Sequence, residues 1–367
     1  MGRFVSLKRK GGHYFATCPF HQEKTASFSV NPQKQFFHCF GCGKSGDAIH
    51  FIREYEHLEF IPAVERLGSI FGLSVDLPTQ GQAGFKPAEN SKRKSAYALN
   101  QVVAAFFKQQ LKTHAFSQHA LDYLKGRGFN PEGPCFEQFG LGLAPPGKYN
   151  LSKYLEAEKA DQMLAQDLGL LGKPQIYDKF RSRIIFPIQD LQGRVLGFGG
   201  RLLELESQKS QGDQSEQADW GAAKYLNSAD SLIFHKGEVL FGLYQIRRYL
   251  STSITQQMPI LVTEGYLDVL SLMQAEIPAV ASMGTALTEK QLQLLTKYYQ
   301  NICFCFDGDA AGQRAAKKAL DLIFPYLEDG LRVKFLSLPQ GEDPDSYLRL
   351  KGRTAFLELL DKAQDIS

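Results

Sequence analysis

The sequence lacks any apolar run long enough to span a membrane, and its first residues do not form a secretory signal. It is also poor in charge, because Asp, Glu, Lys and Arg make up only 22% of the 367 residues. Apolar residues, at 43%, supply ample material for a core. The composition therefore argues against extensive disorder, and the length predicts two or three domains.

The chain has no strong net charge of either sign, since the formal value is +3, but its charges are unevenly distributed. Residues 1–100 hold 13 Lys and Arg against 8 Asp and Glu, whereas residues 201–300 hold 8 against 11. A basic first half and an acidic second half suit a protein whose N-terminal half binds a polyanion and whose C-terminal half binds a metal. An ordinary solvated surface would give the same mild bias.

Cysteine is scarce, and three of the six cysteines show no metal-binding pattern. Cys303 and Cys305 alternate with apolar residues in a predicted strand and are expected in the core. Cys135 stands alone and is assigned no role.

The other three cysteines form two ligand pairs with a histidine. Cys18-Pro-Phe-His21 and Cys39-Phe-Gly-Cys42 each separate two ligands by two residues, and the segment between them predicts a β-hairpin. Two such pairs can close one tetrahedral, structural zinc site per chain with no open position. Buried thiols beside unrelated histidines are the structural alternative, and His13 and His38 could compete as ligands without having the spacing.

Acidic residues follow apolar runs in the last third of the chain. Glu264 ends the run Pro259-Ile-Leu-Val-Thr, and Asp307 and Asp309 end the run Ile302-Cys-Phe-Cys-Phe. Asp343 and Asp345 follow a third apolar run after a short loop. Runs of this kind predict buried parallel strands, whose carboxyl ends meet at one edge of a sheet.

Five carboxylates at one edge would repel each other unless a cation binds them. Hard oxygen ligands predict magnesium, with manganese as a substitute. A solvated acidic rim or a set of helix N-caps is the structural alternative. Helical segments separate the runs, so the fold is expected to be α/β with right-handed crossovers. These helices are Tyr266–Glu276, Thr288–Tyr299 and Ala311–Leu327.

Arginines cluster around a predicted hairpin in the middle of the chain. Its strands are Ile184–Ile188 and Arg194–Phe198, and the pair Gly199-Gly200 follows. Clustered arginines beside glycines suit phosphate contacts, although ion pairs with neighbouring acids would explain them as well. The arginines expected to contact phosphate are Arg181, Arg183, Arg194 and Arg201.

The acidic motifs resemble the toprim domain, which topoisomerases, bacterial primases and some nucleases share. The residues that carry the resemblance are Glu264-Gly-Tyr-Leu-Asp268, Asp307-Gly-Asp309-Ala-Ala-Gly312 and Glu342-Asp343-Pro-Asp345. The resemblance implies phosphoryl transfer on nucleic acid. It implies that Glu264, Asp307 and Asp309 are catalytic, with Glu264 either a metal ligand or a general acid/base.

The first part of the chain resembles the zinc ribbon of bacterial DNA primases, through Cys18-Pro-Phe-His-Gln-Glu-Lys-Thr25 and Phe37-His-Cys-Phe-Gly-Cys-Gly43. The middle part resembles the catalytic core of the same family. The matching segments there are Arg127, Phe180-Arg-Ser-Arg-Ile184, Gly193-Arg-Val-Leu-Gly-Phe-Gly-Gly-Arg201, Lys224-Tyr-Leu-Asn-Ser228 and Phe234-His-Lys-Gly237. This resemblance implies that Arg127, Lys224, Lys236 and the four arginines line a groove for template and nucleotide.

The expected architecture is an N-terminal zinc ribbon, small β plus helix, joined to a mixed α/β polymerase core with a parallel toprim sheet and helices at the C-terminus. The expected parts are a zinc ribbon at 1–75, a flexible basic linker at 76–95, a basic subdomain at 96–256, the toprim subdomain at 257–340 and the start of a helical subdomain at 341–367. The family carries a helicase-binding domain after its core, and we expect this chain to lack it.

The resemblance implies a DNA-dependent RNA polymerase that makes short primers from ribonucleoside triphosphates on single-stranded DNA. Such a protein is expected to be a cytoplasmic monomer at the replication fork. A toprim nuclease would cleave rather than extend, and a topoisomerase would need a further domain for its tyrosine. A non-catalytic recombination mediator with zinc and toprim parts would bind DNA without consuming nucleotides.

Overall fold

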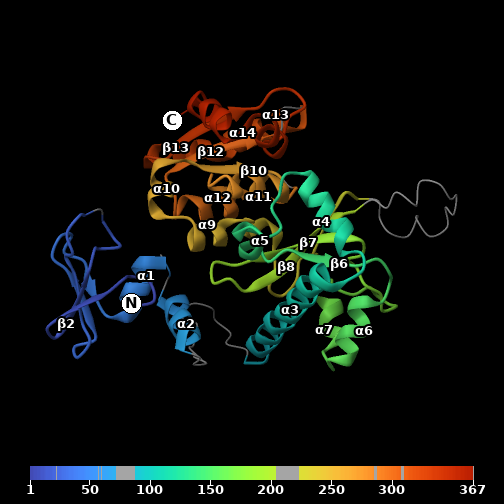
Figure 1. Cartoon of the computed structure of the whole chain (residues 1–367), viewed down its shortest axis with the longest axis horizontal. Helices are drawn as coiled ribbons and strands as arrows, with labels where there is room; N and C mark the ends of the chain where they lie inside the picture. Colours follow the sequence, from blue (N-terminus) through green and yellow to red (C-terminus); the bar gives the residue numbers. More distant parts are fainter. Residues whose placement is uncertain are drawn as a thin grey trace. The chain divides into compact units, whose positions relative to one another are not determined.

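The computed structural model describes residues 1–21, 23–56, 58, 60–71, 87–203, 223–284, 287–306 and 310–366. The chain divides into two compact units, Met1–Pro87 and Ala88–Ser367, shown in Figure 1. Among the described residues, no helix combines the length and the apolar character needed to cross a bilayer.

The first unit is a small antiparallel sheet followed by two helices. Each strand pairs with the next in chain order. The strands are β1 (Lys8–Lys10), β2 (His13–Ala16), β3 (Phe28–Asn31), β4 (Phe36–Cys39) and β5 (Ser45–Gly46), and the helices are α1 (Ala48–Glu56) and α2 (Phe60–Phe71). The core of the unit is aromatic, because Phe28, Phe37 and Phe51 are fully buried against one another. The predicted hairpin is β3–β4.

The second unit begins with helices around a four-stranded antiparallel sheet of order β6-β7-β8-β9. The strands are β6 (Gly142–Ala144), β7 (Arg183–Gln189), β8 (Val195–Leu202) and β9 (Tyr225–Asn227). The helices before β7 are α3 (Pro87–Thr113), α4 (Ser117–Gly126), α5 (Pro134–Phe139), α6 (Asn150–Ala157) and α7 (Gln162–Asp167). The 3₁₀ turn η2 (Lys236–Glu238) and the helices α9 (Leu243–Tyr249) and α10 (Thr252–Gln257) lead to the next sheet.

The second sheet of this unit has the order β11-β10-β12-β13-β14, and its first four strands are parallel. The strands are β10 (Ile260–Thr263), β11 (Ala279–Ala281), β12 (Asn301–Phe306), β13 (Arg332–Ser337) and β14 (Gln364–Asp365). The helices between them are α11 (Tyr266–Gln274), α12 (Glu289–Thr296), α13 (Ala310–Ile323) with the 3₁₀ turn η3 (Phe324–Asp329), and α14 (Pro344–Asp361). The parallel sheet expected from the apolar runs is confirmed.

The β7–β8 hairpin lies between two hydrophobic cores. One face contributes Ile184 and Phe186 to the core shared with the parallel sheet. The other face contributes Ile185 and Phe198, which pack with Phe107 of α3. In Figure 1, α3 accordingly runs beneath the hairpin, with β10 and β12 above it. Because successive side chains of a strand point to opposite faces, burial on both sides explains the continuous apolar run.

Two expected boundaries differ from the structure. The linker predicted for 76–95 is helical from Pro87, where α3 begins, because proline suits the first helical position and good helix formers follow it. The rest of that linker, 76–86, lies outside the described residues. The segment expected to begin a separate helical subdomain forms α14 and then β14, which pairs with β13 of the parallel sheet.

Gly199 of β8 packs closely against the helix that follows β10 of the parallel sheet. A Cβ atom on this glycine would lie 2.3 Å from Cζ of Tyr266, the first residue of α11. We therefore expect Gly199→Ala to lower the free energy of unfolding by about 1–3 kcal/mol, as overpacking usually does. Denaturant unfolding measures this change.

Gly126→Ala is the matched control, because a Cβ atom there would meet nothing within 4 Å. Its effect should stay within about 0.5 kcal/mol. Equal effects of the two substitutions would contradict the tight packing at Gly199.

Candidate functional site

The four predicted zinc ligands converge in the first unit. One ligand atom each from Cys18, His21, Cys39 and Cys42 lies within 4.8 Å of the others. The Sγ atoms of Cys18 and Cys42 are 3.9 Å apart, and Cys39 Sγ lies 3.8 Å from Nδ1 of His21. Zinc–sulfur bonds of about 2.3 Å in a tetrahedron imply sulfur–sulfur distances of about 3.8 Å, so this donor set fits zinc.

Polar hydrogens point at the sulfur atoms of the cluster. The backbone amides of Phe20 and Cys42 donate to Cys18 and Cys39 respectively, each over 3.4 Å. The Ser27 hydroxyl lies 3.1 Å from Cys39 Sγ. Burial by itself would raise the pKa of the Cys39 thiol, but the hydrogen bonds from Ser27 and the backbone outweigh it and lower the pKa to about 7. A thiolate is the form that binds a metal.

Glu23 supports this cluster, although its role was not predicted from the sequence. Its carboxylate lies 3.3 Å from Nε2 of His21 and accepts the backbone amides of Cys18 (2.6 Å) and Ser27 (3.2 Å). A carboxylate on the outer nitrogen of a ligand histidine fixes the orientation of the ring. The position of Glu23 two residues after the histidine was the available signal, but spacing alone does not show which way the side chain turns.

The acidic edge forms where the parallel strands end. Glu264 directly follows β10, whose neighbours β11 and β12 run in the same direction, as does β13 beyond β12. The backbone carbonyl of Glu264 accepts the amide of Gly284, which follows β11. Asp307 and Asp309 come directly after β12 in the sequence and lie outside the described residues.

The other two predicted magnesium ligands lie at the start of α14. Asp343 is its N-cap, and Oδ1 accepts the amide of Ser346 over 2.6 Å. Asp345 is buried, and its oxygens accept Arg127 Nη1 (2.5 Å) and Ser271 Oγ (2.9 Å). Burial raises the pKa of Asp345, and the hydrogen bonds from Ser271 and Arg127 oppose that rise.

Tyr266 fixes the chain next to Glu264. Its hydroxyl donates to Oδ1 of Asn227 over 2.6 Å, and Nδ2 of Asn227 donates to the carbonyl of Met283 over 3.1 Å. Burial raises the pKa of Tyr266, so this hydroxyl stays protonated and can donate. The contacts connect β9 of the antiparallel sheet to the edge that carries Glu264.

Two of the predicted basic residues lie together with two tyrosines. The guanidinium of Arg127 lies 5.6 Å from the ring of Tyr123, whose hydroxyl accepts Nε of Arg201 over 2.9 Å. Arg201 also lies 4.9 Å from the ring of Tyr225. We call these four residues the arginine–tyrosine row. It was not expected from the sequence, because Tyr123 has no motif of its own.

The remaining basic residues of this region differ in exposure. Arg181 and Arg183 are buried, and Arg183 donates to the carbonyls of Gly200 (3.0 Å) and Ala223 (3.1 Å). Lys224 is exposed and Lys236 is half-buried, with its pKa lowered by burial. The structure therefore gives Arg183 a backbone-binding role and leaves Lys224 open to solvent.

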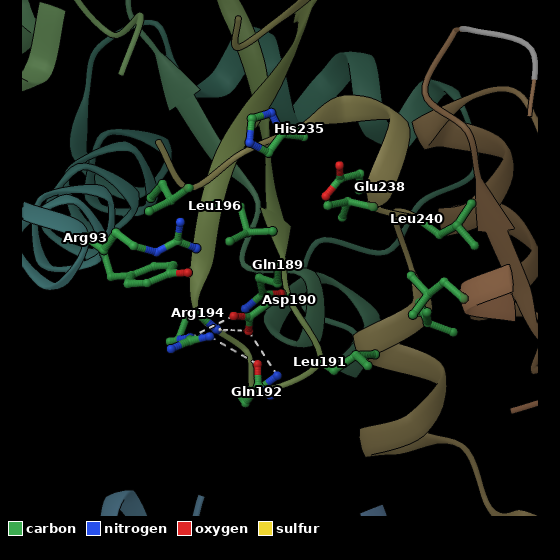
Figure 2. Close-up of a pocket in the computed structure, with 15 residues that line it drawn as sticks. Arg93, Gln189, Asp190, Leu191, Gln192, Arg194, Leu196, His235, Glu238 and Leu240 are labelled. Carbon is green, nitrogen blue, oxygen red and sulfur yellow. Dashed lines mark hydrogen bonds and ion pairs between the residues drawn. The ribbon is translucent and has the colours of Figure 1, made fainter. Parts of the chain in front are cut away.

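Arg194 lies apart from Arg201, at the other end of β8. It follows the turn of the β7–β8 hairpin, about 20 Å along β8 from Arg201 by the rise of a strand. It lines a cavity of about 300 Å³, and Figure 2 shows it beside Asp190 and Gln192. There it donates to Asp190 over 2.7 Å and its guanidinium lies 4.3 Å from the ring of Tyr97. The alternative of an ion pair with a neighbouring acid, considered above for the arginines, is realised at Arg194.

Comparison with protein families matches three successive regions of the chain. Residues 1–83 match the CHC2 zinc finger, 106–247 the N-terminal domain of the DNA primase catalytic core, and 261–348 a Toprim-like domain. The zinc finger match and the donor geometry together support zinc in the first unit. The Toprim match implies a divalent metal in the second.

Curated relatives carry the same name over nearly the whole chain. The DNA primase of Pseudomonas aeruginosa is 44% identical over 359 residues, which cover 96% of this chain and 50% of that protein. The DNA primase of Salmonella typhimurium is 41% identical over 367 residues, which cover 99% of this chain and 59% of that protein. The chain thus spans about half the length of the curated relatives it matches.

Solved structures agree in fold. The Aquifex aeolicus primase structure with its zinc-binding and RNA polymerase domains is 33% identical, with a TM-score of 0.63, covering 100% of this chain and 82% of that one. A DnaG primase catalytic domain bound to single-stranded DNA is 37% identical, with a TM-score of 0.64, covering 75% and 83%. With the zinc cluster, the parallel sheet and these matches in the same order along the sequence, the chain belongs to the DNA primase family.

Proposed function

We propose that this chain makes short RNA primers from ribonucleoside triphosphates on a single-stranded DNA template, as part of DNA replication. The proposal rests mainly on one observation. A single compact unit holds Glu264 at the carboxyl edge of a parallel sheet, and Tyr266 connects this edge to the antiparallel sheet that bears basic residues. Ligands of open α/β sheets gather at this edge. The relative solved with single-stranded DNA supports the choice of template.

We infer that the divalent metal is magnesium and that Glu264, Asp307 and Asp309 hold it, with Asp343 at the same edge. Carboxylate oxygens are the donors that magnesium prefers, and manganese binds the same donors. When bound, the ion would activate the attacking 3′-hydroxyl and stabilise the pyrophosphate leaving group. Asp343 also caps α14, so the fold itself fixes the position of this carboxylate.

The basic residues would hold template and triphosphate by charge. Exposed Lys224 and half-buried Lys236 are the side chains best placed to meet phosphate, because Arg183 and Arg201 already bind protein groups. The carbonyls of Lys236 and Val239 accept Nε2 of Gln291, over 3.0 and 2.8 Å, which fixes the turn that carries Lys236. Zinc in the first unit would be structural, and that unit would engage the template strand.

The acidic edge gives the central test. Asp309→Asn should keep the fold and abolish primer synthesis, because it removes one proposed metal ligand. Without metal, the variant should be as stable as the wild type or slightly more stable, since one of several mutually repelling charges is gone. Magnesium should raise the melting temperature of the wild type by mass action and that of the variant less. A magnesium titration of both synthesis and melting temperature measures these effects.

Asp361→Asn, at an exposed position at the end of α14, is the charge-matched control and should behave as the wild type. Primer synthesis retained in Asp309→Asn would refute the assignment. Shortening of a labelled strand instead of extension would favour a nuclease, and DNA binding without nucleotide consumption would favour a non-catalytic mediator.

Loss of zinc tests the first unit. Purified protein should contain one zinc per chain, and Cys39→Ser should lose it and unfold the first unit, because zinc binding supplies much of the folding free energy of such a small domain. The second unit has its own cores and should stay folded. Metal analysis and circular dichroism measure both effects. Cys135→Ala is the control and should keep its zinc, whereas stoichiometric zinc in Cys39→Ser would refute the ligand set.

Template binding by charge is tested at Lys224. Its replacement by alanine should weaken single-strand binding and make the plot of log affinity against log salt shallower by about 0.7, the value for one lost phosphate contact. Lys153→Ala, at an exposed position on α6, is the matched control. Equal salt slopes for wild type and Lys224→Ala would mean that Lys224 does not contact the template backbone.

A further inference from the structure

Asp345 differs from Glu264 and Asp343, which are half-buried, in being almost fully buried, with 1% of its surface exposed. Each of its carboxylate oxygens accepts a hydrogen bond from another element of the second unit. Oδ2 accepts Nη1 of Arg127 at 2.5 Å, and Oδ1 accepts the hydroxyl of Ser271 at 2.9 Å. The carboxylate therefore connects α14 with Arg127, which follows α4, and with α11.

Arg127 passes this connection on to the antiparallel sheet. Its guanidinium lies 5.6 Å from the ring of Tyr123, and the hydroxyl of Tyr123 accepts Nε of Arg201. Arg201 in turn lies against Tyr225 of β9. An unbroken series of contacts thus leads from the start of α14 through the arginine–tyrosine row to β9.

We propose that Asp345 is a positioning residue and not a ligand of the catalytic metal. Its ion pair with Arg127 holds α14 in place and balances the positive charge of that arginine; we call this contact the clamp. The place of Asp345 after the third apolar run had predicted a magnesium ligand. The inference goes beyond the proposed function, and it rests on that function only where template binding is measured.

Charge explains why this carboxylate is poorly suited to a divalent cation. A cation bound to Asp345 would lie within a few ångströms of the Arg127 guanidinium, and like charges at that distance repel strongly in a buried site. The ion would have to displace Arg127 or Ser271, and either loss would leave a buried polar group without its partner. In the part of the chain that the structure describes, the Asp343 carboxylate bonds to the amide of Ser346 in its own helix and forms no ion pair, so it remains the better donor.

Asp345→Asn separates the two roles in protein that retains its zinc but is kept free of magnesium. Breaking a buried ion pair is costly, so the clamp predicts a melting temperature lower by roughly 5–10 °C in buffer without magnesium. A metal ligand in an acidic cluster predicts an unchanged or higher value. Asp343→Asn is the matched control, because asparagine caps a helix as well as aspartate does and stability without magnesium should hold.

Three further measurements complete the test. The double variant Asp345→Asn/Arg127→Gln should be destabilised by less than the sum of the single variants, since the residues act as a pair. The magnesium concentration that gives half of the melting-temperature gain should stay within about twofold of wild type in Asp345→Asn. Release of Arg127 should also steepen the salt dependence of magnesium-free single-strand binding, by about 0.7 for one new phosphate contact.

Additive effects of the two substitutions, together with a large rise in the magnesium requirement of Asp345→Asn, would overturn the clamp. An unchanged salt slope would overturn the statement that Asp345 withholds Arg127 from the template. If Asp345→Asn does not fold, Ser271→Ala can replace it, because it removes only one of the two hydrogen bonds to Asp345. This variant should have a lower melting temperature and an unchanged magnesium requirement. A higher magnesium requirement in Ser271→Ala would count against the clamp. Absence of primer synthesis in the wild type would refute the proposed function and leave the stability and coupling results intact.

Discussion

The packing of Tyr266 between the two sheets of the second unit is the contact on which the proposed active site depends. Its ring stacks on Phe186 of β7 at 4.9 Å and meets the edge of Phe241 at 4.8 Å. Its hydroxyl reaches Asn227 of β9. Because Tyr266 begins α11 two residues after Glu264, the same side chain that seals the core also sets the backbone at the acidic edge. A substitution that disturbs the packing of Tyr266 is therefore also expected to shift the backbone that carries Glu264.

Much of the fold could be predicted from local patterns. The apolar runs before Glu264 and Asp307 became β10 and β12, and the two-residue gaps of the zinc ligands led to the cluster found in the first unit. Boundaries were less predictable. The basic end of the expected linker, residues 92–94, became part of α3, which begins at Pro87, since lysine, arginine and alanine suit an exposed helix as well as a flexible chain.

The site was harder to predict than the fold, because its partners lie far apart in the sequence. Asp345 and Arg127 are 218 residues apart, and no spacing rule connects them. Clustered arginines suggested a phosphate-binding surface, yet Arg183 binds backbone carbonyls and Arg194 binds Asp190. A sequence shows the charge of a side chain, but only the fold shows whether that charge already has a partner.

The position of the β7–β8 hairpin between two cores restricts how the second unit can move. Separating either face of the hairpin from its core would expose apolar side chains on β7 or β8 to water, which costs free energy. A local rearrangement that admits a substrate is therefore expected in shorter, less buried elements. Tyr225–Asn227 of β9 and the turn Lys236–Glu238 are such elements, and each carries or adjoins a lysine proposed to bind phosphate. In this view, the buried hairpin keeps the two cores packed, while β9 and the turn at Lys236 are the parts that can move when a substrate enters.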